Sequence, residues 1–166
     1  MKIVIVSDTH MPRMAKQLPM ALTPHLSNAD AIIHAGDWQD KSVYEKLVQY
    51  APVYGVTGNV DEEWLHRRFT KKILLKIDNV RIGVTHGDGK GKTTEQRAMD
   101  LFSQEAIDIL IFGHSHIPLK KDKDGMILFN PGSPTDKRRQ QQYSFGLLEI
   151  NDKSYTISHL FFDSKK

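Results

Sequence analysis

Residues that bind metals or form turns follow six apolar segments of the chain, each directly after the last apolar residues. These six stretches read Ser7-Asp8-Thr9-His10, His34-Ala35-Gly36-Asp37, Thr57-Gly58-Asn59-Val60-Asp61, Thr85-His86-Gly87-Asp88, Gly113-His114-Ser115-His116 and Asn130-Pro131-Gly132-Ser133. Open α/β sheets place their sites just beyond the carboxyl ends of their strands. We therefore expect the six stretches to meet along one rim of the molecule.

Seven side chains in these stretches offer an oxygen or a nitrogen to a cation. They are Asp8, His10, Asp37, Asn59, His86, His114 and His116. Asp8 and His10 are two residues apart on one loop, so both can face one ion, and the two carboxylate oxygens of Asp37 can bridge two ions. This mixture of ligands suits divalent ions such as Mn, Fe, Co, Ni or Zn. Each stretch alone is an ordinary turn sequence, and their joint occurrence predicts a site for one or two metals.

The other four histidines are not expected to bind metal. His25 lies on the helix predicted over 18–26 and His66 on a further predicted helix without assigned bounds, and we expect both to face solvent. His159 lies in the last predicted strand, away from the six stretches. His34 precedes Gly36-Asp37 inside a predicted strand, and its position favours a packed strand residue over a ligand.

The elements that position these residues alternate between short β-branched runs and amphipathic stretches. We predict strands over 3–6, 31–34, 53–56, 73–77, 81–85, 109–112, 119–121, 126–129, 145–150 and 155–162, and helices over 18–26, 42–50 and 93–104. Turn sequences at Asp78-Asn79, Asp124-Gly125 and Asn151-Asp152 join strands into hairpins. The first half reads β-α-β-α-β and the second half is mostly hairpins, which predicts an α/β fold of two packed sheets with helices outside.

Composition narrows the class of protein further. The chain has 166 residues with no repeat or linker, which predicts a single domain over 1–166. It has no cysteine, which excludes disulfides, thiolate zinc sites and a cysteine nucleophile. The net charge of +3 is mild and does not indicate nucleic-acid binding.

No apolar segment approaches the roughly 20 residues of a membrane span, and the N-terminus is unlike a signal peptide, so we expect a cytoplasmic protein without membrane association.

The set of motifs resembles a known family. Asp8-x-His10, Gly36-Asp37, Gly58-Asn59-x-Asp61, His86 and Gly113-His114-Ser115-His116 look like the five motifs of the calcineurin-like metallophosphoesterases. The short length, and the segment from Asn130 to Asp136, are similar to those of the small YfcE-like bacterial and archaeal phosphodiesterases. The resemblance covers residues 8–136 and implies a four-layer αββα sandwich of two mixed sheets flanked by helices.

The resemblance also implies two metal sites that share Asp37. One would comprise Asp8, His10, Asp37 and His116, and the other Asp37, Asn59, His86 and His114. We expect two divalent ions per chain, Mn first, with Fe, Zn, Ni or Co as alternatives. Many members of the family have a histidine after Gly-Asn in the third motif, and it protonates the leaving group. Val60 stands at that position here, and the YfcE-like branch also lacks the histidine.

These motifs predict a metal-dependent phosphodiesterase. The expected reaction is in-line attack on a phosphate ester by a hydroxide that bridges the two cations. We assign Asn59, Asp61 and His86 to the catalytic group, and Asp61 can instead orient neighbouring ligands. Arg13, three residues after the first motif, and Arg138, after the last motif, are candidate contacts to a small phosphate-ester substrate, with solvated loop charges as the alternative.

Three other functions are compatible with the fold. A retromer subunit has the same fold and serves as a protein-interaction scaffold with a degraded metal site, but none of the seven ligand positions is replaced here. A phosphomonoesterase is an alternative hydrolase. A nuclease is disfavoured because the chain lacks a stripe of basic and aromatic residues. Assembly into a homo-oligomer is left open by the sequence.

Overall fold

Ten strands form two five-stranded sheets in the computed structural model, which describes residues 1–166. The first sheet has the order β10-β9-β1-β2-β3 and the second the order β4-β5-β6-β8-β7. The strands of the first sheet are β1 (Lys2–Val6), β2 (Ala31–His34), β3 (Val53–Gly55), β9 (Tyr143–Asn151) and β10 (Ser154–Phe162). Those of the second are β4 (Lys72–Ile77), β5 (Val80–Thr85), β6 (Ile109–Ile111), β7 (Leu119–Lys123) and β8 (Met126–Asn130).

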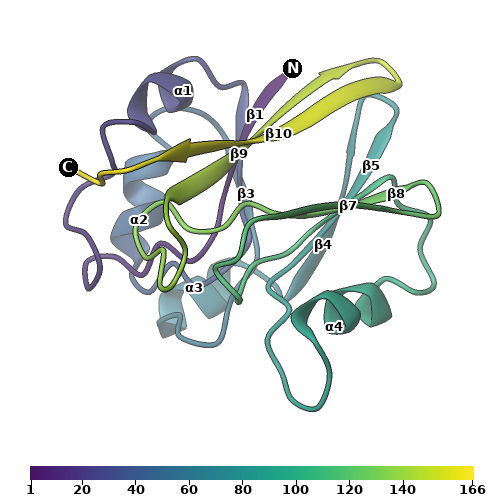
Figure 1. The fold of residues 1–166 in the computed structure, drawn as a ribbon, viewed down its shortest axis with the longest axis horizontal. Coiled ribbons are helices and arrows are strands. Elements are labelled where there is room, and N and C mark those ends of the chain that lie inside the picture. Colours follow the sequence, from purple (N-terminus) through teal and green to yellow (C-terminus); the bar gives the residue numbers. More distant parts are fainter.

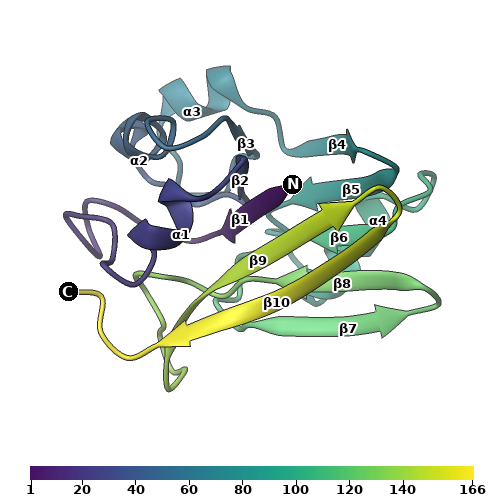
Figure 2. The same cartoon turned by 90° about the horizontal axis from the view of Figure 1, so that it is seen from above.

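Four helices cover the outer faces of the two sheets. They are α1 (Thr23–Ser27), α2 (Lys41–Leu47), α3 (Glu63–Arg68) and α4 (Thr94–Leu101). Figure 1 shows α1, α2 and α3 beside the first sheet and α4 beside the second, while Figure 2 shows the long β9–β10 hairpin running along the edge of the first sheet. None of the four helices combines the length and the apolar character that a membrane span requires.

Three apolar layers hold these elements together. A cluster of 15 buried residues, including Ile5 and Ile111, fills the space between the two sheets. A second cluster of 14 buried residues joins the first sheet to α1, α2 and α3, and a third of five residues lies under α4. The predicted αββα sandwich of two mixed sheets is therefore confirmed.

The central strands of each sheet are parallel, and this brings their carboxyl ends together. In the first sheet Val6 pairs with His34, and His34 pairs with Gly55, so β1, β2 and β3 end side by side. In the second sheet Val84 pairs with Ile111, which pairs with Phe129. All six strands that precede the metal-type stretches thus end in one region, as the sequence predicts.

The predicted strands and hairpins are observed with boundary shifts of a few residues, and the three turns each contain a residue in the left-handed region, Asp78, Asp124 and Asp152. The prediction for the first helix was wrong at its start. The helix begins at Thr23 rather than at residue 18, and Pro24 lies in its first turn. Proline lacks an N–H and fits only the first turn of a helix, so Pro24 marks the start of α1 and not its end.

Candidate metal centre

Six of the seven predicted ligands form two adjoining groups. Asp8, His10 and His116 form one group, and Asp37, His86 and His114 form the other. In each group the candidate ligand atoms all lie within 4.8 Å of one another. The groups meet at Asp37, whose Oδ2 is 3.5 Å from His10 Nε2 and 3.2 Å from His86 Nε2. Asp37 therefore lies between the two groups, as a bridging carboxylate would.

Five of these six residues have a left-handed backbone. The φ angles are 56° at Asp8, 44° at His10, 57° at Asp37, 70° at His114 and 60° at His116. Such a conformation costs a residue other than glycine about 1–3 kcal/mol when it is held at a functional site. A left-handed conformation persists at such residues only where the surrounding structure enforces it. The rest of the fold therefore stabilises the strained backbone of this centre.

Four buried atoms of the centre have no hydrogen-bond partner. They are Asp8 Oδ1, His10 Nε2, His86 Nε2 and His116 Nε2. Leaving a buried polar atom unpaired costs about 1–3 kcal/mol, and buried polar groups in native proteins are nearly always paired. All four atoms are ligands suited to a divalent cation, and bound cations would satisfy them together. The donor set therefore fits the metal ions that the sequence predicts.

The remaining atoms of the ligands are fixed by outer hydrogen bonds. His86 Nδ1 donates to the carbonyl of Ala35 at 2.8 Å, and His116 Nδ1 donates to the carbonyl of Asp136 at 2.6 Å. Because Nδ1 donates outward in each ring, Nε2 is the nitrogen that faces the centre, and it can offer its lone pair to a cation once it carries no proton. Asp8 Oδ2 accepts from Ser7 Oγ at 2.7 Å and from the His114 N–H at 3.0 Å, which leaves Asp8 Oδ1 free for a cation.

The charges of the centre are strongly coupled. Burial alone would lower the pKa of His86, but the carboxylates of Asp8 and Asp37 raise that pKa to about 9. Burial would likewise raise the pKa of Asp8, but His86, His10 and His116 hold it well below its usual range. The pair of carboxylates thus attracts positive charge into the centre, and a divalent cation would compete there with the proton on His86.

A cavity of about 560 Å³ opens beside the centre. It is lined by His10, Arg13, Met14, Gln39, Val60, Asp136 and Arg138. His10 thus faces both the cation ligands and the cavity. Arg13 and Arg138, the two arginines predicted to contact substrate, both line it, although 125 positions separate them in the sequence.

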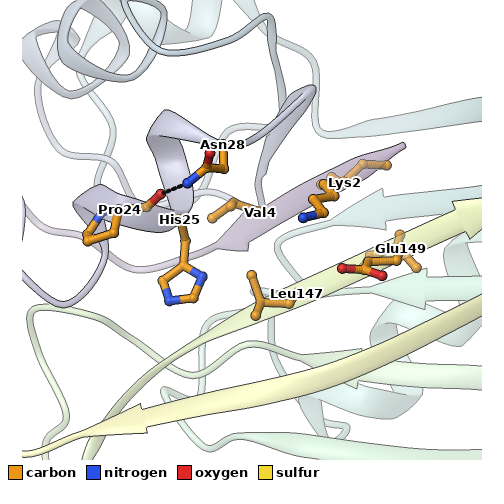
Figure 3. Close-up of a pocket in the computed structure, with 9 residues that line it drawn as sticks. Lys2, Val4, Pro24, His25, Asn28, Leu147 and Glu149 are labelled. Atoms are coloured by element: carbon orange, nitrogen blue, oxygen red, sulfur yellow. Dashed lines mark hydrogen bonds between the residues drawn. The ribbon is translucent and has the colours of Figure 1, made fainter.

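Another pocket, of about 320 Å³, lies away from the centre. Figure 3 shows it between α1 and β9, with Pro24, His25 and Asn28 on one side and Leu147 and Glu149 on the other. None of the candidate ligands lines this pocket. His25 is half-buried here and packs against Phe145 at 5.3 Å between ring centroids, so it is less exposed than predicted.

Comparison with known proteins assigns the family. The family model described as the calcineurin-like phosphoesterase superfamily domain matches residues 1–153. The chain belongs to this superfamily. It is 39% identical over 154 residues to a probable metallophosphoesterase of Methanocaldococcus jannaschii, covering 92% of this chain and 78% of that protein. It is 27% identical over 183 residues to the phosphodiesterase YfcE of Escherichia coli, covering 93% and 95%.

A solved structure with the same fold comes from Entamoeba histolytica. It is the crystal structure of wild-type Vps29 complexed with zinc, with a TM-score of 0.77 and 26% identity, covering 98% of this chain and all of that one. The similarity confirms the arrangement of strands and helices around the candidate metal centre.

In the third motif of this calcineurin-like domain, Asp61 holds the backbone of two loops in place. Asp61 is buried, and its carboxylate accepts hydrogen bonds from the N–H groups of Asp37 at 3.1 Å, Gln39 at 2.8 Å and Gly58 at 2.7 Å. It therefore connects the two loops that carry Asp37 and Asn59. Burial raises the pKa of this carboxyl group. Asn59 is exposed, and its role as a ligand stays a prediction.

The segment after β8 also supports the centre, and the sequence indicated its presence but not its contacts. Ser133 Oγ donates to the carbonyl of Asp8 at 2.8 Å, and Thr135 Oγ1 donates to the carbonyl of Thr9 at 2.5 Å. Both hydroxyls are buried. These two hydrogen bonds attach the loop of the first motif to the segment that follows the second sheet's strand β8. The residues come together only in the folded chain.

His34 has a role that the sequence did not predict. It is buried and stacks on Trp38 at 3.7 Å between ring centroids, so the prediction that it packs in its strand is confirmed. Its Nδ1 accepts from the N–H of Gly36 at 3.2 Å, and its Nε2 is 3.0 Å from Thr9 Oγ1. One imidazole thus connects the loop that carries Asp8 and His10 to the loop that carries Asp37.

Proposed function

We propose that this protein is a metal-dependent phosphodiesterase with two divalent cations per chain. The observation that carries the proposal is the set of four buried ligand atoms without hydrogen-bond partners, gathered where two groups of ligands adjoin. When bound, two such cations supply an activated water for in-line attack and offset the charge that develops on the phosphoryl oxygens. Family membership and the names of the relatives support this reaction class.

The two cation sites share one residue. We assign Asp8, His10, Asp37 and His116 to one site, and Asp37, Asn59, His86 and His114 to the other. The position of Asp37 Oδ2, close to both His10 and His86, supports its role as the shared ligand. We propose manganese as the metal and the cytoplasm as the compartment.

Other residues act on the substrate or on the ligands. Arg13 and Arg138 line the cavity beside the centre, which supports contacts to the substrate. Asn59 and His86 face the reacting phosphate in this proposal, while Asp61 positions the backbone that carries Asp37. Val60 cannot protonate a leaving group, so we expect fast turnover only for esters with good leaving groups.

An enzyme is preferred to an interaction scaffold of the same fold because every ligand position of the family motifs is filled by a ligand type. A phosphomonoesterase or a nuclease would use the same centre. Rates on mono- and diesters, and on nucleic acid at increasing salt concentration, separate these alternatives.

The direct test is hydrolysis of bis(p-nitrophenyl) phosphate by pure protein loaded with Mn, Fe, Co, Ni or Zn in turn. We expect metal-dependent release of p-nitrophenol, and we expect Asp37→Asn to abolish it and to reduce the bound metal measured by elemental analysis. Asp163→Asn, at an exposed site distant in sequence from the motifs, is the matched control. Absence of hydrolysis with every metal, or full activity of Asp37→Asn, would overturn the proposal.

A further inference from the structure

We propose that the substrate carries a second anionic group, a phosphate or a carboxylate, beyond the phosphate ester that is cleaved. This inference rests on the proposed function, and it concerns the cavity of about 560 Å³ beside His10. Arg13 and Arg138 would bind the second group, while the cations hold the ester.

The two arginines lie on loops that contact the metal ligands, and neither guanidinium makes a hydrogen bond or an ion pair within the protein. The backbone N–H of Arg13 donates to Gln39 Oε1 at 3.3 Å, and the next residue, Met14, donates its N–H to the carbonyl of His10 at 2.7 Å. Arg138 follows Asp136, whose carbonyl accepts from His116. Both arginines therefore lie on loops that make hydrogen bonds to candidate metal ligands. Both side chains are exposed to solvent and line the cavity.

The lining holds two arginines and one carboxylate, so the cavity carries an excess of positive charge. Asp136 is the only carboxylate among the lining residues, and its Oδ2 is 3.7 Å from His116 Nδ1, on the side of the metal centre. The charge of the scissile phosphate would be met by the cations. Two guanidinium groups remain, and their planar forks match the geometry of a phosphate or a carboxylate.

The remaining lining favours a compact group over a nucleobase. The cavity volume lies within the range of small-molecule sites, so it has room for more than the phosphate itself. No phenylalanine, tyrosine or tryptophan lines it, and its one ring, the His10 imidazole, belongs to a ligand of the metal centre, so the lining offers a base little surface for stacking. A short, doubly charged phosphate ester fits this combination of volume, charge and polarity.

The experiment compares two ligands of similar size on the Mn²⁺-loaded protein. Ethyl phosphate and 2-phosphoglycolate differ in a methyl group replaced by a carboxylate. Their affinities are measured by calorimetry and by inhibition of bis(p-nitrophenyl) phosphate hydrolysis. We expect phosphoglycolate to bind roughly tenfold more tightly. Arg13→Gln and Arg138→Gln should each remove most of this ratio, while Arg139→Gln, the adjacent exposed arginine outside the cavity lining, should preserve it.

The results separate this inference from the proposed function. Equal affinities for the two ligands, or a ratio that survives both Arg13→Gln and Arg138→Gln, would overturn the second anion even if the protein hydrolyses the diester. An arginine-dependent ratio in a protein that hydrolyses nothing would support the anion site and refute the phosphodiesterase. Circular dichroism of each variant confirms that it is folded, which is expected because all three arginines are exposed.

Discussion

Replacing His34 by phenylalanine tests whether one buried imidazole braces both ligand loops. Phenylalanine keeps an aromatic ring against Trp38, so the stacking is retained, but it removes both hydrogen bonds. The N–H of Gly36 would be left buried without an acceptor, at a cost of about 1–3 kcal/mol, and the bond to Thr9 contributes a further ~0.5–1.5 kcal/mol. We expect the free energy of unfolding of the metal-free protein to fall by about 1.5–4.5 kcal/mol at pH 7.5, measured by urea denaturation.

The same variant should change the response to acid. Because Nδ1 accepts from Gly36, the His34 ring is neutral, and burial lowers its pKa to about 3 from the ordinary 6.5. Below pH 6.5 His34 binds a proton in the unfolded chain but stays neutral in the folded chain. The free energy of unfolding therefore falls by about 1.4 kcal/mol per pH unit as the pH falls toward 3. The His34→Phe variant does not lose stability in this way, because phenylalanine binds no proton. The gap between the two proteins should therefore narrow by about 2 kcal/mol between pH 7.5 and pH 5.

Two further variants separate the effects on the two metal groups. His34→Asn keeps an acceptor near Nδ1 for the N–H of Gly36, and His34→Gln keeps a donor near Nε2 for Thr9. We expect the first to weaken mainly the group that contains Asp8, and the second mainly the group that contains Asp37, in Mn²⁺ titrations by calorimetry. A gap in stability that stays constant with pH, together with unchanged Mn²⁺ affinity in all three variants, would refute the bracing role.

Three further predictions follow from the geometry of the centre. The pKa of His86 in the metal-free protein is raised to about 9, so the stabilisation from protonated His86 is complete below pH 6.5 and is lost as the pH rises through about 9. At pH 8, Mn²⁺ binding should therefore release this proton, which calorimetry in buffers of different ionisation enthalpy measures. Gly58→Ala would place a Cβ 2.0 Å from Asp37 Oδ1 and should lower the bound metal found by elemental analysis. The Cβ of Gly91→Ala has no atom within 4 Å; the left-handed φ of 83° at this exposed position costs stability, but the metal content should stay unchanged. Val60→His should supply a proton donor and accelerate cleavage of alkyl diesters by up to ~10²-fold, with little effect on p-nitrophenyl esters; equal effects on both would contradict this role.

The strand ends were predictable because local sequence determines them. Runs such as residues 3–6 are β-branched and continuously apolar, and polar ligand types begin directly after them. Parallel strands of one sheet end at a common edge, so local sequence groups the stretches by strand ends, while the meeting of the two groups depends on the packing of the two sheets. The resemblance to the family then assigned the individual ligands, and the structure brings six of them into two groups.

The contacts that hold the ligands were not predictable, because they join residues far apart in the chain. Ser133 and Asp8 are separated by 125 positions, and their hydrogen bond exists only once the two sheets pack. The role of His34 depends on which nitrogen carries the proton, and that is decided by the N–H of Gly36. The early start predicted for the first helix has a local cause. Leu18, Leu22 and Leu26 are at helical spacing and favour a start at residue 18, whereas Pro24 marks the true first turn.

The strain of the centre is best understood together with its place between two apolar cores. Five ligands with a left-handed backbone and four unpaired buried atoms each act against folding, by about 1–3 kcal/mol apiece. The clusters of 15 and 14 buried residues on either face of the first sheet can stabilise a fold that contains such a centre. Cations that pair the four atoms would remove part of this cost only in the folded state. Metal binding should therefore be coupled to folding, adding about 2.7 kcal/mol of stability at a metal concentration of 100 Kd for one site.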